Sequence, residues 1–272
     1  MIDAHVHAWP RWPYPVSRLD GDDDATVSRL IRHLDEEGID ACWLIAADLA
    51  DADGDEGDNA YAALARSEHP SRISLFVDVD SRWSSDHHRA GAPERLRARL
   101  DRHPEAAGVA HYLASDDDRW LESGEAARWL REMADRGLVL SLAAGPNWYL
   151  SIAAAAHAVP GLPVVLHHLA GVAHEEDLTR LAALADVPNV HVKLSGAHYL
   201  DARVGTTAAV DRLLDVFGVD RMVWGSDFPV DGKYVAPREA RAMRELLLRG
   251  LSPSERDRVT HANAARLTLT SR

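Results

Sequence analysis

The sequence is poor in cysteine and has no long apolar run. Cys42 is the single cysteine among 272 residues, which excludes an intrachain disulfide and any zinc site built on cysteines. No stretch approaches the roughly 18 consecutive apolar residues that a membrane-spanning helix needs. The first residues, MIDAHVHAWP, lack the basic segment followed by an apolar segment that is typical of a secretory signal. We therefore expect a cytoplasmic protein with no membrane partner.

Positive charge is also scarce. The 30 lysine and arginine residues are outnumbered by 43 aspartate and glutamate residues, and the formal net charge is −13. Because nucleic-acid binding needs clustered lysine and arginine side chains against phosphates, we expect no nucleic-acid partner. Part of the acidic excess falls at residues 48–58, which we interpret as a solvated loop rather than a calcium site. Hydrophobic residues make up 46% of the chain, close to the globular average, which excludes wholesale disorder.

Short apolar runs recur along the whole chain. They begin roughly 25 to 40 residues apart, which is the rhythm of βα units. Segments with apolar residues at every third or fourth position lie between them and predict helices, as at residues 27–34, 127–134 and 210–217. Thr26 is a predicted helix cap, and Ser252, Pro253 and Glu255 form a predicted capping box. The predicted strands are residues 2–6, 41–46, 73–79, 107–113, 138–143, 162–166, 190–194 and 222–224.

Eight strands that alternate with helices over this length predict one (β/α)₈ barrel domain, residues 1–272. A doubly wound open sheet is the alternative, although no G-x-G-x-x-G follows the first strand. In a barrel the catalytic groups lie at the C-terminal ends of the strands. Polar residues at those ends are therefore the candidates for the functional site.

Histidines and one aspartate occupy three of these strand ends. His5 and His7 alternate with apolar residues, so both imidazoles point to one side of the first strand. The sixth run ends in His167 and His168; adjacent residues face opposite sides, so at most one of them faces the barrel interior. The eighth run ends in Asp227, which lies next to the first strand in a closed barrel. We expect His5, His7, His168 and Asp227 around one barrel mouth.

The seventh run adds polar residues inside an apolar strand. Lys193 and Ser195 share one face of that strand. A lysine there must be paired or functional, since burying a bare ammonium costs several kcal/mol. Gly225, two residues before Asp227, leaves room for a close approach.

This residue set supports two kinds of chemistry. Neutral imidazoles and a carboxylate can hold a divalent ion such as zinc, which lowers the pKa of a bound water toward about 7. Without metal, Asp227 can act as general base while the histidines polarise a carbonyl. We expect one divalent ion, zinc before others, with His5, His7, His168 and Asp227 as ligands, and keep a metal-independent site as the alternative.

Five segments in order resemble the amidohydrolase-related branch of the amidohydrolase superfamily: IDAHVH, VVLHHLAG, VKLSG, VWGSDFP and HANAARLTL. The resemblance covers essentially the whole chain and implies a (β/α)₈ barrel. It implies metal or substrate binding by His5 and His7, polarisation of a substrate carbonyl by His168, and proton acceptance or metal binding by Asp227. Lys193 and Ser195 match the K-L-S-G segment of the lactonase-like group.

One departure from the family pattern concerns strand five. Decarboxylases and most mononuclear hydrolases of the superfamily carry a histidine where this chain has Ala143 and Ala144. Strand four offers His111 but no lysine, so a lysine-bridged binuclear centre is not expected. The remaining set resembles the lactonase subgroup.

We therefore predict a hydrolase that attacks a lactone or a related carbonyl compound with an activated water. A non-oxidative decarboxylase of the same family and a catalytically silent ligand-binding barrel are the alternatives. Trp9, Trp148 and Tyr199 are expected to stack on a small ring-shaped substrate, and Arg11, Lys193 and Ser195 to bind its polar groups, including a carboxylate. Barrels of this family often pair, so a homodimer is an assembly to test. The histidines expected on the surface are His33, His69, His87, His88, His103, His157 and His174.

Overall fold

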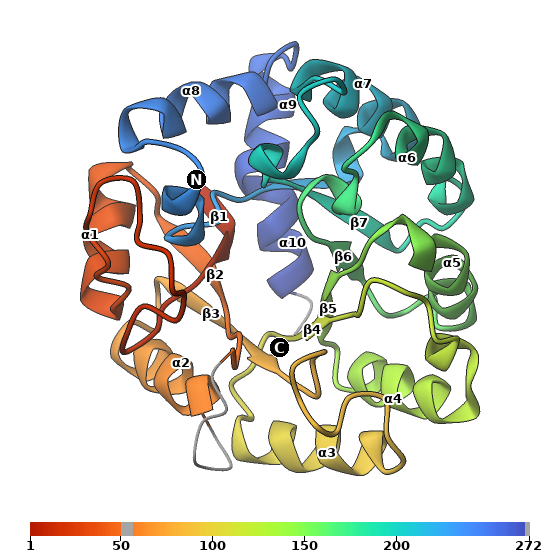
Figure 1. Ribbon diagram of the computed structural model, residues 1–272. Coiled ribbons are helices and arrows are strands. Elements are labelled where there is room, and N and C mark those ends of the chain that lie inside the picture. The colour runs from red at the N-terminus through yellow and green to blue at the C-terminus, as the bar shows by residue number, and fades with distance from the viewer. Residues whose placement is uncertain (50–56, 270–272) are drawn as a thin grey trace.

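Eight parallel strands form the centre of the computed structural model, which describes residues 1–49 and 57–269 (Figure 1). Each strand pairs with the next one in sequence, in the order β1 to β8. β8 returns to β1 through one bridge, Val6 to Phe228, so the sheet closes into a nearly complete barrel. The strands are β1 Ile2–Val6, β2 Ala41–Ile45, β3 Ile73–Asp78, β4 Gly108–Tyr112, β5 Val139–Ala143, β6 Val164–Leu166, β7 Val190–Leu194 and β8 Met222–Trp224.

Helices surround the strands on the outside (Figure 1). Thr26 caps α1 by accepting a hydrogen bond from the Arg29 amide, as the sequence predicts. No helix among the described residues is long and apolar enough to cross a bilayer. The outer helices are α1 Val27–Glu36, α2 Gly57–Glu68, α3 Ala92–Arg102, α4 Gly124–Asp135, α5 Tyr149–Ala158, α6 Glu175–Arg180, α7 Thr206–Phe217 and α8 Pro237–Leu247.

The predicted (β/α)₈ architecture is confirmed, and the open-sheet alternative is excluded by the return of β8 to β1. Three strands have the predicted bounds, and the other five are one or two residues shorter. Residues 50–56 of the acidic stretch lie outside the described residues, so the prediction of a solvated loop there is not tested.

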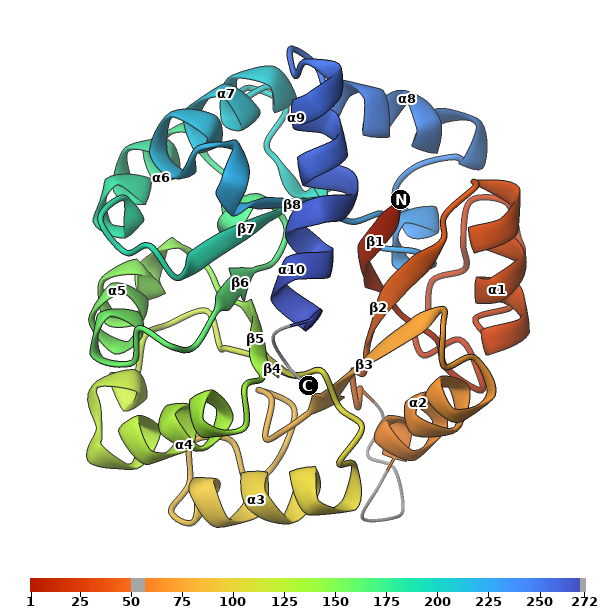
Figure 2. The same ribbon diagram turned by 180° about the vertical axis from the view of Figure 1, so that it is seen from behind.

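The last described helices cover the end of the barrel at which the strands begin. α9 Pro253–Asp257 and α10 Asn263–Leu269 run across it (Figure 2). The Asn263 side-chain amide donates to the carbonyl oxygens of Val219 and Met222 at 2.9 and 2.8 Å. Ala264 and Leu267 pack into the apolar cluster inside the barrel. The interior is therefore apolar at this end.

Histidines away from the strand ends differ in exposure. His157 and His174 are exposed, as predicted. The surface prediction is wrong for His103, which is 7% exposed, and for His88, whose side chain is 6% exposed. It is also wrong for His33 and His87, whose Nε2 atoms are buried. The His88 ring stacks on Trp120 with 4.3 Å between centroids. Loop segments therefore cover His88, which sequence periodicity does not reveal.

Candidate active site

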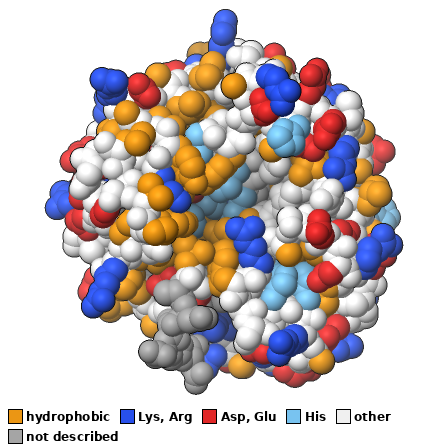
Figure 3. Space-filling view, viewed as in Figure 1, with side chains coloured by type: hydrophobic (Ala, Val, Ile, Leu, Met, Phe, Trp, Pro, Cys, Tyr) orange, Lys and Arg blue, Asp and Glu red, His pale blue; other side chains and the backbone are white. Residues whose placement is uncertain are grey.

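A cavity of about 480 Å³ opens at the C-terminal ends of the strands. His7, His168 and Asp227 form part of its wall, together with Tyr199. Seen from this side, the centre of the molecule is hollowed, and histidine surface lies in the hollow (Figure 3). The predicted barrel mouth therefore exists as an accessible cavity.

His5, His7 and Asp227 come together at this mouth. Nε2 of His5 lies 3.2 Å from Nε2 of His7. Oδ1 of Asp227 lies 3.4 Å from the first nitrogen and 3.7 Å from the second. The Asp227 amide also donates to the His5 carbonyl oxygen at 2.9 Å, so the closure of β8 onto β1 fixes their spacing. The convergence predicted from strand parity is present in the structure.

The hydrogen bonds of these imidazoles fit a metal ion. Nδ1 of His7 lies 2.7 Å from the Ile45 carbonyl oxygen. Because a carbonyl oxygen can only accept, Nδ1 carries the proton and Nε2 of His7 is bare toward His5 and Asp227. Two imidazole nitrogens and a carboxylate oxygen are ligands that zinc accepts, and a second hydrogen bond that fixes the tautomer is typical of metal-binding histidines. His5, His7 and Asp227 therefore fit a divalent ion.

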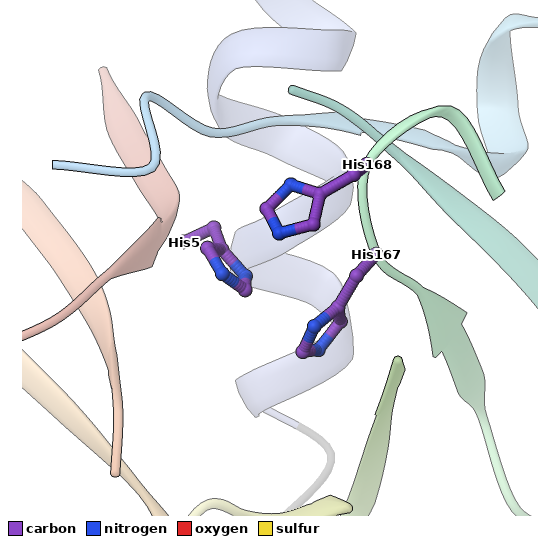
Figure 4. Close-up of side chains that lie close together, drawn as sticks. All are labelled: His5, His167 and His168. Carbon is purple, nitrogen blue, oxygen red and sulfur yellow. The ribbon is translucent and has the colours of Figure 1, made fainter. Parts of the chain in front are cut away.

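His167 and His168 both turn toward His5 (Figure 4). Their ring centroids lie 4.4 and 4.6 Å from that of His5. The prediction that at most one of them faces the interior is wrong, because β6 ends at Leu166 and His168 has a φ of 46°. A left-handed residue breaks the alternation of side chains along a strand. Nε2 of His168 lies 3.9 Å from Oδ1 of Asp227.

Two glycines make room for this packing. A Cβ at Gly225 would lie 2.7 Å from Cβ of His5, as the sequence analysis anticipates. A Cβ at Gly196 would lie 2.7 Å from the ring of His168, and its φ of 63° is a conformation that glycine adopts freely. The histidines approach β7 and β8 closely because these positions have no side chain.

Lys193 lies fully buried beneath the cavity rather than in its wall. Its Nζ lies 2.8 Å from Nδ1 of His5 and donates to Oγ of Ser141 at 2.7 Å. Burial holds the pKa of Lys193 well below its usual value. A neutral amine can accept a hydrogen bond from Nδ1 of His5, which leaves Nε2 of His5 bare toward Asp227. Lys193 therefore orients His5.

Asp227 is a buried carboxylate surrounded by polar side chains. Burial alone raises its pKa, but His168, His7 and His198 outweigh this effect and hold the pKa below its usual value. Burial lowers the pKa of His168 to about 4 despite the nearby Asp227. Near neutral pH the site thus contains an ionised carboxylate beside the neutral imidazoles of His5 and His168. Tyr199 donates its hydroxyl hydrogen to Oδ2 of Asp227 at 3.1 Å.

His198 is a site residue that the sequence analysis missed. Its Nε2 lies 3.6 Å from Oδ2 of Asp227. It belongs to a short 3₁₀ segment after β7, Ala197–Tyr199, where neither strand nor helix periodicity applies. The only signal is its position three residues after Ser195, past the left-handed Gly196.

Of the predicted substrate-binding residues, only Tyr199 lies in the cavity wall. Ser195 is buried and its hydroxyl lies 3.1 Å from Nδ1 of His168. Trp9 stacks on His7 and donates to the Ala47 carbonyl oxygen, and Trp148 is 0% exposed. Arg11 is exposed. These side chains therefore do not line the cavity as the sequence analysis expected.

Other aromatic and cationic side chains take their place in the wall. Tyr14 lies under Lys233, whose Nζ is 3.7 Å from the ring centroid. Arg82 and Trp83 enter from the loop after β3, and Tyr112 from the end of β4. The cavity thus combines flat rings with positive charge around the Asp227 cluster.

Ala143 and Ala144 lie in the same wall at the end of β5. Small side chains therefore occupy this part of the cavity wall. A larger substrate can approach β5 at this point.

Comparison with known proteins identifies the family of the chain. The model of a family described as Amidohydrolase matches residues 2–267. The chain is 29% identical over 144 residues to the L-fucono-1,5-lactonase of Burkholderia ambifaria, and the match spans about half of each protein, 49% in both cases.

Solved structures show the same fold. An amidohydrolase from Burkholderia multivorans with bound zinc has a TM-score of 0.77 at 21% identity, with 98% of both chains covered. A probable 2-pyrone-4,6-dicarboxylic acid hydrolase from Acinetobacter baumannii, with citric acid bound, has a TM-score of 0.75 at 17% identity, again with 98% of both chains covered.

Proposed function

Because the chain belongs to the amidohydrolase family, we propose that it is a hydrolase that opens a lactone ring by attack of an activated water. The observation that carries this proposal is the ionised Asp227 beside the bare imidazole nitrogens of His5 and His7 at the cavity floor. Such a carboxylate can accept a proton from a water molecule while that water attacks a substrate carbonyl bound beside it.

We also propose that the site holds a divalent ion, zinc before others. Nε2 of His5, Nε2 of His7 and Oδ1 of Asp227 are the atoms that would bind it. When bound, the ion would polarise the substrate carbonyl and make water more acidic.

The chain's own residues account for the proton transfers. Asp227 takes a proton from water as the water oxygen bonds to the lactone carbonyl carbon. The carbonyl oxygen becomes an oxyanion, and the wall around His168 provides the polar groups that stabilise it. The ring C–O bond then breaks, and Asp227 returns its proton to the leaving oxygen. Tyr199 holds Asp227 in position through its hydroxyl group.

The side chains that line the cavity support a particular substrate class. Arg82 and Lys233 place positive charge in the cavity, and Tyr14, Trp83 and Tyr112 offer flat faces. We propose a ring-shaped lactone that carries a carboxylate, which these groups would bind by charge and stacking. The relatives named as a sugar lactonase and as a probable pyrone dicarboxylate hydrolase support a lactone substrate.

A panel of sugar and aromatic lactones, followed by acid release, tests the reaction, and release of carbon dioxide instead would favour the decarboxylase alternative. We expect Asp227→Asn to lower kcat by about 10²–10⁴-fold, the usual contribution of a general base. Asparagine also tolerates the left-handed backbone of this residue, whose φ is 67°, so the fold should survive. Asp215→Asn, exposed on α7, is the matched control. Near-normal turnover by Asp227→Asn would refute the assignment.

A further inference from the structure

A second histidine cluster lies outside the barrel. His87 and His88 belong to the loop between β3 and α3, and His111 lies on β4 with its side chain buried. One ring nitrogen of each histidine lies within 4.8 Å of the others. Histidine surface is visible both in the central hollow and beside it (Figure 3). The proposed lactone hydrolysis uses none of these three residues.

Nδ1 of each of the three rings forms a hydrogen bond with an oxygen atom. Nδ1 of His87 lies 2.8 Å from the Asp80 carbonyl oxygen, and Nδ1 of His111 lies 2.8 Å from the Val79 carbonyl oxygen. Carbonyl oxygens only accept, so both Nδ1 atoms carry the proton and, in the neutral rings, both Nε2 atoms are bare.

His88 follows the same rule. Its Nδ1 lies 2.6 Å from Oδ2 of Asp118, and a carboxylate also accepts. Nε2 of His88 nevertheless lies 3.2 Å from Nε2 of His111. Two bare nitrogens that face each other at this distance repel unless a cation joins them. Nε2 of His87 is buried and has no hydrogen-bond partner, so a third lone pair is also unused.

The spacing suits a metal ion. Two imidazole nitrogens that bind one tetrahedral zinc ion at about 2.0–2.1 Å lie about 3.3–3.4 Å apart. The separation of 3.2 Å between His88 and His111 is close to that value. The His87 ring stacks on His88 with 3.7 Å between centroids, so it has to turn for all three nitrogens to bind one ion. Second hydrogen bonds from Nδ1 to a carbonyl or carboxylate are what metal-binding histidines normally make.

We propose that His87, His88 and His111 form a second metal site, which takes a divalent ion of the zinc class through their Nε2 atoms, with water as a further ligand. Three imidazole ligands favour zinc and its transition-metal neighbours over calcium or magnesium, which prefer oxygen. The rival occupant is a proton held by His88 between Asp118 and His111.

An ion bound at this site would hold in place a loop that forms part of the wall of the catalytic cavity. The loop that carries His87 and His88 also carries Arg82 and Trp83, which line that cavity. A metal ion on His111 would tie this loop to β4. The role is structural and leaves the chemistry at Asp227 unchanged.

Zinc binding tests the proposal in protein whose catalytic cluster is disabled. The variant His7→Asn/Asp227→Asn removes two of the three ligating groups there, and chelator-treated protein is then titrated with Zn²⁺ by calorimetry. We expect one tightly bound ion. Addition of His87→Gln and His88→Gln should weaken that binding at least about 100-fold, and Asp118→Asn about 10–100-fold. His157→Gln/His174→Gln, at exposed histidines, is the matched control and should leave it unchanged.

No tight ion in the background variant, or unchanged binding after the His87 and His88 substitutions, would overturn the proposal. Should the multiple variants fail to fold, crystals of the unaltered protein soaked in zinc give the answer. An anomalous peak among the three Nε2 atoms supports the site, and clear density without a peak there refutes it. Because no substrate is needed, this result is independent of whether the protein hydrolyses lactones.

Discussion

At the scale of single residues, the site depends on positions that lack a side chain as much as on those that have one. We predict that Gly225→Ala lowers kcat at least about 10-fold and costs about 1–3 kcal/mol of stability, since its Cβ would lie 2.7 Å from that of His5. Gly161→Ala is the control, because a Cβ there meets nothing within 4 Å. Thermal melts and turnover of both variants check this; equal behaviour would contradict it.

Lys193 gives a second prediction at this scale. Lys193→Met keeps the length of the side chain but removes the partner of His5, so kcat should fall about 10–100-fold, the usual effect of losing a group that orients a metal-binding histidine. The melting temperature should change little, because an apolar replacement of a buried amine avoids its desolvation cost. Kinetics and calorimetry on one preparation separate the two effects. A large loss of stability with normal kcat would show that Lys193 is only structural.

Strand parity predicts that His5 and His7 point to the same side, and barrel closure predicts that Asp227 lies next to them, although Asp227 follows β8 with a φ of 67°. Strand parity fails at His167 and His168, where the chain leaves β6 through left-handed residues. Such conformations are usual for glycine, and nothing in the pattern of apolar residues announces them at a histidine.

At the scale of elements, boundaries are predictable where periodicity or capping chemistry defines them. Ser252 and Glu255 form the expected capping box: the Ser252 hydroxyl accepts from the Glu255 amide, and the Glu255 carboxylate accepts from the Ser252 amide at 2.8 Å. The short 3₁₀ segments were not predicted, because three residues carry no periodicity. His198 and Tyr199 lie in one of them. Sequence analysis predicts Tyr199 from its aromatic ring but gives no reason to select His198.

We predict that Ser252→Ala destabilises the protein by about 1 kcal/mol and lowers Tm by about 2–4 °C. The reason is the loss of the hydroxyl that satisfies the Glu255 amide at the start of α9. Differential scanning calorimetry measures the shift. Thr207→Ala, at an exposed position of α7, is the comparison, and a shift of equal size there would remove the capping explanation.

At the scale of the whole molecule, buried titratable groups set the dependence of stability on pH. Burial lowers the pKa of His33 and His191 to about 4. Below about pH 6.5 these imidazoles therefore bind protons in the unfolded chain but not in the folded protein. Stability from these groups is lost as the pH falls from about 6.5 toward 4. Burial also raises the pKa of Asp78 and Asp231 to about 7, which acts in the opposite direction. Histidines with lowered pKa values are His5, His33, His88, His111, His167, His168, His191 and His198; carboxyls with values raised to about 6 or 7 are Asp3, Asp58, Asp78 and Asp231.

The histidines in this set outnumber the carboxyls, so unfolding takes up net protons between about pH 6 and pH 4.5. Each net proton changes the free energy of unfolding by about 1.4 kcal/mol per pH unit. We therefore predict a lower Tm at pH 4.5 than at pH 6.5, measured by calorimetry in metal-free buffer. His191→Leu should reduce the difference, since it removes one such group inside β7. A Tm that rises on acidification would show that the carboxyls dominate.

The helix α10, which covers the end of the barrel where the strands begin, affects how the chain folds during synthesis. Ala264 and Leu267 cover apolar residues contributed by strands that precede them in the sequence, from Ala4 on β1 to Val223 on β8. During synthesis those strands leave the ribosome before α10, and the apolar residues that α10 covers stay exposed to water until it follows them. The nascent polypeptide is prone to aggregation during that interval, when chaperones would have the most apolar surface to protect.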